Sequence, residues 1–562
     1  MKKLFILVVA VMVFSLILAG CGSPTTPSTP ATSTQPTTQT TTQPTSTTPA
    51  TSTTPATSAS PTVKPTQDTI RIANADFGNE SFDQNDVSTW CWYTNDRLVT
   101  QDGGGKVVPA IAEKFEFDPL TGIWTFHIRQ GVKFHNGDPL TAADVKFSID
   151  RFGDTSISKS PWSPYIGAKY NKKETKIIDD YTVQFIPDHP ELQQGIVFAQ
   201  VMIYPKNYFE SVGHDGFNKA PIGTGPWKFV SLVSKTKLSL TANTDYWGKK
   251  PAFKNLVETL VPEQSTRIAM LKSGDADIIF PQVGIDWDRI AELQSQGFRT
   301  VNLGLPSAYT LAFQATWLTG AGPTGDIRVR QAMSYALNRD EIGQTWYHGY
   351  AKPGGMFFML QGGNGSPQGY GYSDDLLPTP FDLANAKSLL AQAGYPSKFA
   401  DPVIHIFAPP AQQDFMQVLI GYWQAAGIQV KLEVVDMSVY YGMLFTRPKE
   451  GDKNVGWLWP WTSPGVMNAT YHCANMYTTW GVHGTSNDAK ATQMYNDYLK
   501  ITDPVQAEQA FSDFQKYVKT LWVDFGLMQI EPVYIAGPAL GEFTGYSWMS
   551  NQDAINGVQQ PK

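Results

Sequence analysis

Three tryptophans at alternate positions have the types and spacing that best suit contact with a ligand. Trp457, Trp459 and Trp461 lie in the segment 456–464, GWLWPWTSP, of a chain that holds 16 tryptophans. Flat indole rings suit the apolar faces of sugar rings, aromatic compounds or proline-rich peptides. We take these three residues and Ser463 as candidate ligand contacts, with core packing as the alternative role for the rings.

Catalytic and metal-binding patterns have much weaker support. The chain has no G-x-x-x-x-G-K-[ST] phosphate loop and no H-E-x-x-H zinc helix, and the glycines of 222–226, IGTGP, precede a proline rather than a helix. His472, Cys473 and His483 lack a fourth metal ligand at a convincing spacing. The aspartate pair 374–375 is better explained as a solvated loop than as an acid and a base. We therefore expect no catalytic residue, no metal site and no cofactor.

The elements that must position the candidate contacts show clear local signals. Residues 124–128 alternate between apolar and polar, which predicts a half-buried strand, and Asn136-Gly137 predicts a tight turn. Thr141 and Asp144 form the pattern of a capping box at the start of a helix. The apolar face of that helix holds Val145, Ile149 and Phe152.

Strands and helices alternate along the rest of the chain. Ile70 and Ile72 predict an opening strand. An apolar helical stripe between 416 and 423 ends at Gly427, and residues 428–434 then alternate as a strand. This alternation predicts an α/β protein.

Six blocks resemble the extracellular solute-binding proteins of family 5, the dipeptide and oligopeptide receptors of ABC importers. The longest is WTFHIRQGVKFHNGDPLTAADVKFS at 124–148. The other blocks follow in the family's order and are IGTGP (222–226), NTDYWGKKP (243–251), LKSGDADII (271–279), RVRQAMSYALNR (328–339) and FDLANAKSLLAQAGY (381–395). The resemblance covers nearly everything after Asp68.

The resemblance implies an α/β fold of the type II periplasmic-binding-protein class, with three lobes and the ligand enclosed in the cleft between them. Lobe I is expected at about 67–108, 216–310 and 531–562, lobe II at about 109–215 and lobe III at about 311–530. The expected partners are a peptide or another oligomeric solute and the subunits of an ABC permease, and we expect a monomer.

The same resemblance implies further site residues and one departure from the family pattern. In the family, a tryptophan of the 456–464 segment is followed three positions later by an aspartate that holds a peptide's amino terminus. Here that position is Pro460, so a buried ammonium would lack its counter-charge. The alignment also places a strand-like, ligand-binding stretch at FDQND (82–86), which makes Asp83 and Asn85 candidates, although a solvated turn is the alternative.

The N-terminal residues predict export. Lys2 and Lys3 precede an apolar run from 4 to 18, too short for a comfortable membrane span, so 1–20 is predicted to be a signal peptide. Leu18-Ala19-Gly20-Cys21 resembles a lipobox, which makes Cys21 the expected lipid attachment site. Residues 21–66 are almost only Thr, Pro, Ser and Ala and predict a disordered tether. We expect a protein anchored to the outer face of the cytoplasmic membrane.

Net charge and cysteine content bear on the possible partners and disulfide bonds of the protein. The net charge of -7 argues against nucleic acid as a partner. With Cys21 assigned to lipid, Cys91 and Cys473 could form a disulfide or remain free thiols, and the sequence leaves both open.

The function we expect is therefore capture of peptides for an ABC permease, without catalysis by this chain. An oligosaccharide or aromatic-compound receptor is the first alternative, because of Pro460 and the tryptophans. Binding of nickel or a nickel chelate, a surface hydrolase and a sensory receptor are further alternatives.

Overall fold

A computed structural model of the whole chain provides the structure. It describes residues 68–86, 90–102, 106–160, 162–168, 172–279, 287–302, 306–355, 369–395, 403–464, 469–531, 533–538 and 540–541. The predicted signal peptide, Cys21 and the tether lie outside the described residues. Among the helices that are described, none is both long enough and apolar enough to cross a membrane.

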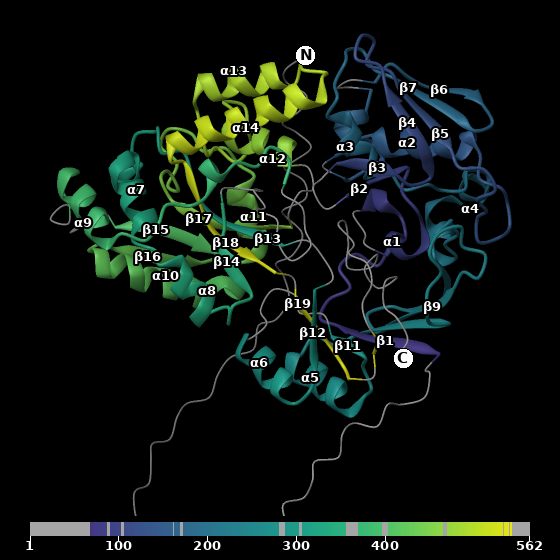
Figure 1. Cartoon of the computed structure of the whole chain (residues 1–562), viewed down its shortest axis with the longest axis horizontal. Helices are drawn as coiled ribbons and strands as arrows, with labels where there is room; N and C mark the ends of the chain where they lie inside the picture. Colours follow the sequence, from purple (N-terminus) through teal and green to yellow (C-terminus); the bar gives the residue numbers. More distant parts are fainter. Residues whose placement is uncertain are drawn as a thin grey trace, which may run out of the picture. The chain divides into compact units, whose positions relative to one another are not determined.

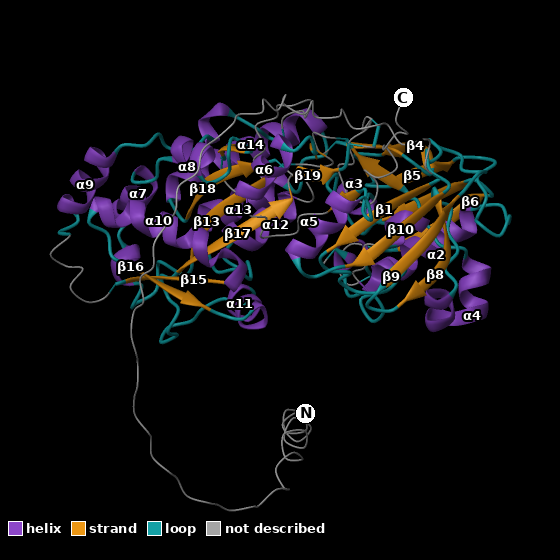
Figure 2. Cartoon of the chain, turned by 90° about the horizontal axis from the view of Figure 1, so that it is seen from below, coloured by secondary structure: helices purple, strands orange, loops and turns teal. Residues whose placement is uncertain are grey.

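A seven-stranded sheet collects strands from distant parts of the chain. Its order is β12 (Arg299–Asn302), β19 (Val533–Ala536), β11 (Ile278–Ile279), β1 (Thr69–Asn74), β10 (Asn255–Leu260), β9 (Lys237–Ala242) and β8 (Trp227–Val233). β1 runs parallel to both of its neighbours, β10 and β11, and Figure 2 shows β1, β10, β9 and β8 side by side. The predicted opening strand is confirmed, with Ile70 and Ile72 buried.

A four-stranded antiparallel sheet carries the predicted strand, turn and helix. Its order is β4 (Ala112–Phe117), β5 (Trp124–Ile128), β7 (Thr182–Ile186) and β6 (Glu174–Asp179). Gly137 has a φ of 94°, as the predicted turn requires. Helix α2 (Ala142–Gly153) begins with the predicted capping box between Thr141 and Asp144, and its predicted apolar face is buried. These three predictions are confirmed.

A six-stranded mixed sheet contains the tryptophan segment (Figure 1). Its order is β14 (Ala351–Pro353), β18 (Asp524–Ile530), β13 (Ser307–Phe313), β17 (Leu458–Pro464), β15 (Ile404–Ala408) and β16 (Val430–Val434). Helix α10 (Gln413–Ala426) ends at Gly427, whose φ of 88° is left-handed, and β16 follows as predicted. The apolar stripe of α10 packs into the core beside this sheet.

The remaining helices and strands complete a mixed α/β architecture, as predicted. They are α1 (Cys91–Thr94), β2 (Val99–Gln101), β3 (Val107–Pro109), α3 (Gln194–Phe198), α4 (Lys206–Lys219), α5 (Gln264–Ser273), α6 (Trp287–Ser295), α7 (Ile327–Tyr335), α8 (Arg339–Thr345), α9 (Leu383–Gln392), α11 (Met437–Leu444), α12 (Ala469–Tyr477), α13 (Ala489–Tyr498) and α14 (Pro504–Leu521).

The two described cysteines do not form a disulfide. Cys91 and Cys473 are buried, are not bonded to each other and belong to different hydrophobic clusters. Of the two alternatives that the sequence left open, the structure therefore has separate thiols in apolar surroundings rather than a Cys91–Cys473 disulfide.

Candidate functional site

Strand β17 holds the tryptophan segment and has unequal neighbours on its two sides. On one side it pairs with β13 along its whole length, from Phe313–Leu458 to Ser307–Pro464. On the other side, its pairing with β15 consists of Ile406–Leu458 alone within the described residues. β15 runs parallel to β16 and to β17, and ligands of open α/β sheets bind outside the carboxyl ends of such strands. Among the described strands, the later half of β17 therefore has β13 as its one neighbour and forms an open edge at the carboxyl end of the sheet.

The backbone of β17 beyond Leu458 offers hydrogen bonds toward that open side. Along an antiparallel pair, alternate residues point their N–H and C=O groups toward the partner strand or away from it. Pro460 and Pro464 lack an N–H, and the carbonyl of Pro460 accepts a hydrogen bond from the Tyr440 hydroxyl on α11. These residues thus point away from β13, and Thr462 between them does so too. Thr462 presents an N–H and a C=O at the open edge.

Trp459 and Trp461 lie on one face of β17, and Trp457 directly precedes the strand. The three rings have different environments. Trp457 is half-buried and stacks on His405, with ring centroids 4.6 Å apart. Trp459 is 0% exposed, so it packs in the core, which is the alternative role considered for these rings. Trp461 is half-buried, with its ring 6.2 Å from that of Trp459. Ser463 lies opposite Ala308, and its side chain lies outside the described residues.

Cys473 and His483 are buried and His472 is half-buried, and the three do not form a metal-binding group among the described residues. Burial lowers the pKa of His472 to about 3 and that of His483 to about 4, and it raises the pKa of the Cys473 thiol. Both imidazoles are therefore neutral at pH 7. The ring of His472 lies 5.0 Å from that of Trp162, which brings α12 against the segment that follows α2.

Asp83 and Asn85 occupy a buried turn instead of the expected strand-like stretch. Residues Gln84–Asp86 form a 3-10 helix, because the Asp83 carboxylate accepts a hydrogen bond from the Asn85 backbone N–H at 3.0 Å and favours a turn. The same carboxylate accepts two hydrogen bonds from the Arg151 guanidinium on α2. Neither Asp83 nor Asn85 is exposed by more than 1%. The expectation of a strand here is wrong, whereas their ligand role stays a prediction.

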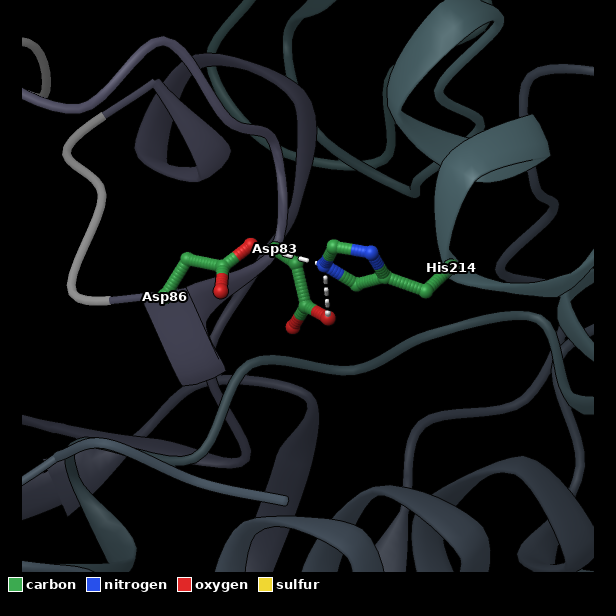
Figure 3. Close-up of side chains that lie close together, drawn as sticks. All are labelled: Asp83, Asp86 and His214. Carbon is green, nitrogen blue, oxygen red and sulfur yellow. Dashed lines mark hydrogen bonds and ion pairs between the residues drawn. The ribbon is translucent and has the colours of Figure 1, made fainter. Parts of the chain in front are cut away.

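His214 joins this turn to α4, as Figure 3 shows. Its Nε2 lies 2.7 Å from an Asp86 carboxylate oxygen and 3.7 Å from one of Asp83. Burial opposes ionisation of Asp86, but hydrogen bonds from Lys159, His214 and Ser81 outweigh it and lower the Asp86 pKa to about 2.

In the part of the chain that is described, one group of His, Cys, Asp or Glu side chains could hold a metal ion. It consists of Asp83, Asp86 and His214. Arg151 and Lys159 already supply positive charge to the two carboxylates. We interpret the group as an ion-pair joint. No local sequence pattern indicates this group, because Arg151 lies 68 residues from Asp83, and His214 lies 128 residues from Asp86.

Comparison with known proteins decides the family. The family model of the bacterial extracellular solute-binding proteins, family 5 (middle region), matches residues 106–478. This chain belongs to that family. The family's members are transport receptors that bind solutes outside the cytoplasm, so the resemblance read from the six sequence blocks is confirmed.

Individual relatives span most of the chain. It is 27% identical over 452 residues to the dipeptide-binding protein of Escherichia coli, covering 72% of this chain and 79% of that protein. It is 28% identical over 392 residues to heme-binding protein A of Haemophilus influenzae, covering 64% and 67%. The structure of DppA from Helicobacter pylori in complex with the peptide STSA covers 88% of this chain and 99% of its own, with 22% identity and a TM-score of 0.67. The predicted periplasmic-binding-protein fold is confirmed.

Proposed function

We propose that this protein is a lipid-anchored receptor that captures peptides and delivers them to an ABC permease. The observation that carries the proposal is the open edge of β17, where Thr462 presents an N–H and a C=O that pair with no strand among the described residues. An extended peptide can add to such an edge as a further strand, because main-chain hydrogen bonds bind any sequence. The similarity to the dipeptide-binding protein of Escherichia coli supports a peptide as the solute.

We also propose the anatomy that this role needs. The seven-stranded, four-stranded and six-stranded sheets would be the cores of lobes I, II and III, with Asp83, Asn85, Trp457, Trp461 and Ser463 near the solute. Trp459 would support the neighbouring rings from the core. Acylation of Cys21 and the tether up to residue 66 would hold a monomeric receptor near its permease.

Replacement of Thr462 by proline tests the open edge. Thr462→Pro removes one N–H that β13 does not use, whereas Thr462→Ala keeps it. We expect the full-length protein to bind Ala-Ala-Ala or Ser-Thr-Ser-Ala in isothermal titration calorimetry. Thr462→Pro should weaken binding about tenfold, the order expected for one lost hydrogen bond, and Thr462→Ala by less than threefold. Absence of binding by the unaltered protein to any peptide would reject peptide capture.

A receptor for aromatic compounds is the second candidate, because the tryptophan face of β17 offers flat apolar surface and Pro460 offers no carboxylate. The similarity to heme-binding protein A supports it. A thermal-shift comparison of peptides, cello-oligosaccharides, hemin and nickel separates the two, since a ligand at 100 times its Kd stabilises the native state by about 2.7 kcal/mol. Stabilisation by hemin or sugars without stabilisation by peptides would favour this candidate.

A further inference from the structure

Helix α11 leaves much of its apolar surface exposed. Its inner residues Tyr440 and Leu444 are buried in the core cluster beside β17. On the outer face Tyr441 is 42% exposed, and Phe445, directly after the helix, is 50% exposed. Met437 and Val439 are also exposed, by 50% and 48%. A contiguous exposed apolar patch on a soluble protein commonly marks a binding surface.

The patch is continuous with the candidate site on β17. The rings of Tyr441 and Phe445 stack at 5.9 Å, and Phe445 meets Trp461 edge to face at 6.4 Å. Tyr440, which precedes Tyr441, donates its hydroxyl to the Pro460 carbonyl and so fastens α11 to β17 where the open edge begins. Thr462 lies two residues farther along the strand, about 7 Å away at the usual rise. A solute paired with Thr462 would thus lie near the outer rings of α11.

The chemistry of the rings indicates what the patch can take. His483 packs against Phe445 at 5.0 Å, and burial lowers its pKa to about 4, so it is neutral at pH 7. Tyr441, Phe445 and Trp461 therefore form a contact surface without a formal charge, and the buried His483 ring lies behind Phe445. Such rings gain most from an apolar or aromatic partner, through area burial and offset or edge-to-face stacking. Gly442 beside Tyr441 leaves open space, because a Cβ there would meet no atom within 4 Å.

We propose that Tyr441 and Phe445 extend the solute site from β17 onto the outer face of α11 as an aromatic wall for an uncharged aromatic or apolar side group. This inference rests on the proposed capture of solute at β17. Tyr441 and Phe445 would determine the selectivity for side chains, while the open edge of β17 binds the backbone of the solute.

The test measures selectivity with tripeptides in isothermal titration calorimetry on the full-length protein. The probes are Ala-Ala-Ala and the three tripeptides that carry one Phe. We expect the best Phe peptide to bind at least tenfold more tightly than Ala-Ala-Ala. The double variant Tyr441→Ala/Phe445→Ala should reduce that ratio below threefold and leave the Kd of Ala-Ala-Ala within twofold. About half of each residue is exposed, so an unchanged Tm should show that the fold persists.

Phe381→Ala is the matched control, because Phe381 is also an exposed phenylalanine, at 45%, and lies outside α11. It should keep the tenfold ratio. A ratio that survives in the double variant, or no preference for Phe in the unaltered protein, overturns the aromatic wall but leaves peptide capture standing. Absence of all peptide binding rejects the proposed function and the wall together. Self-association that the double variant abolishes, with the ratio unchanged, would make the patch an interface between copies and also overturn the wall.

Discussion

At the residue scale, Pro460 leaves the candidate site without a carboxylate at that position. Its position is buried, and its carbonyl is already bonded to Tyr440. A carboxylate is therefore missing at the point where the family pattern places a partner for an ammonium group. An unpaired buried charge is costly, so a solute should not place a free amine beside Pro460.

Pro460→Asp should restore a preference for free amines. The unaltered protein is expected to bind Ala-Phe-Ala and N-acetyl-Ala-Phe-Ala with Kd values within threefold of each other. The Asp variant should prefer the free amine at least tenfold, because the ammonium neutralises the new carboxylate, and its ligand-free Tm should fall. Pro460→Asn is the neutral control and should show no such preference. Equal discrimination by the Asn and Asp variants would contradict the charge argument.

Glu258 on β10 is a residue whose protonation is governed by burial. It is 0% exposed and accepts hydrogen bonds from Asn74 at 2.6 Å and from Tyr93 at 3.4 Å. Burial raises its pKa from 4.5 to about 7 despite these bonds. The folded state therefore binds a proton that the unfolded chain has released between these two pH values. Stability from this group is greatest below pH 4.5 and is lost as pH rises to about 7.

Glu258→Gln should remove that pH dependence. Urea unfolding at several pH values from 4.5 to 8 should show the unaltered protein losing stability relative to the variant, on the order of 3 kcal/mol. The Gln amide oxygen can still accept the hydrogen bond from Asn74. Stability curves that run parallel for the two proteins would mean that the carboxyl is not held protonated.

At the element scale, the joint between α2 and the 3-10 helix Gln84–Asp86 depends on a buried ion pair. The Arg151 guanidinium bonds both oxygens of Asp83 and lies 4.2 Å from the Phe209 ring centre on α4. One side chain thus fastens three elements. Breaking a buried pair from one side leaves an uncompensated charge, which costs far more than losing an exposed pair.

Arg151→Met should lower the free energy of unfolding by about 3–5 kcal/mol in urea denaturation. The double variant Asp83→Asn/Arg151→Met should recover part of that loss, because no unpaired charge remains. Lys206→Met on α4 is the control, since its pair with Glu210 is exposed and contributes less than about 1 kcal/mol. Similar decreases in the free energy of unfolding for Arg151→Met and Lys206→Met would show that the buried ion pair contributes no more stability than the exposed pair.

The elements that the sequence predicted are those with complete local signals. Strand β5 has its alternation, α2 its capping box and α10 its terminal glycine, and each of these signals acts within a few residues. The turn at 84–86 was only the alternative interpretation, as a solvated turn, and its burial escaped prediction because its partners Arg151 and His214 are distant in the sequence. The tryptophan alternation indicated one shared face of β17 but could not show that Trp459 is core and Trp461 half-buried, because that depends on α11 and His483.

At the scale of the whole molecule, a receptor of this family must stay near the permease that it serves. The predicted lipid on Cys21 and the Thr/Pro/Ser tether would provide that proximity without restricting orientation. Anchoring by one cysteine can be tested by replacing that residue.

Cys21→Ser should release the protein from the membrane. Fractionation of expressing cells should find the unaltered protein in the membrane fraction and the Ser variant in the soluble extracytoplasmic fraction or the medium. Peptide binding in solution should be unchanged, because the replaced residue precedes the tether. A Ser variant that remains in the membrane fraction would show that another feature anchors the chain.

The burial of both described cysteines makes the chain a suitable scaffold for an optical sensor. Thiol reagents attack the thiolate, and burial raises the pKa of Cys473 while Cys91 is equally enclosed. A cysteine introduced at Gly442, in open space beside Tyr441, would be labelled selectively in a Cys21→Ser background. An environment-sensitive dye at that point would change its emission when a solute covers the rings of α11, so the protein would report solute concentration directly.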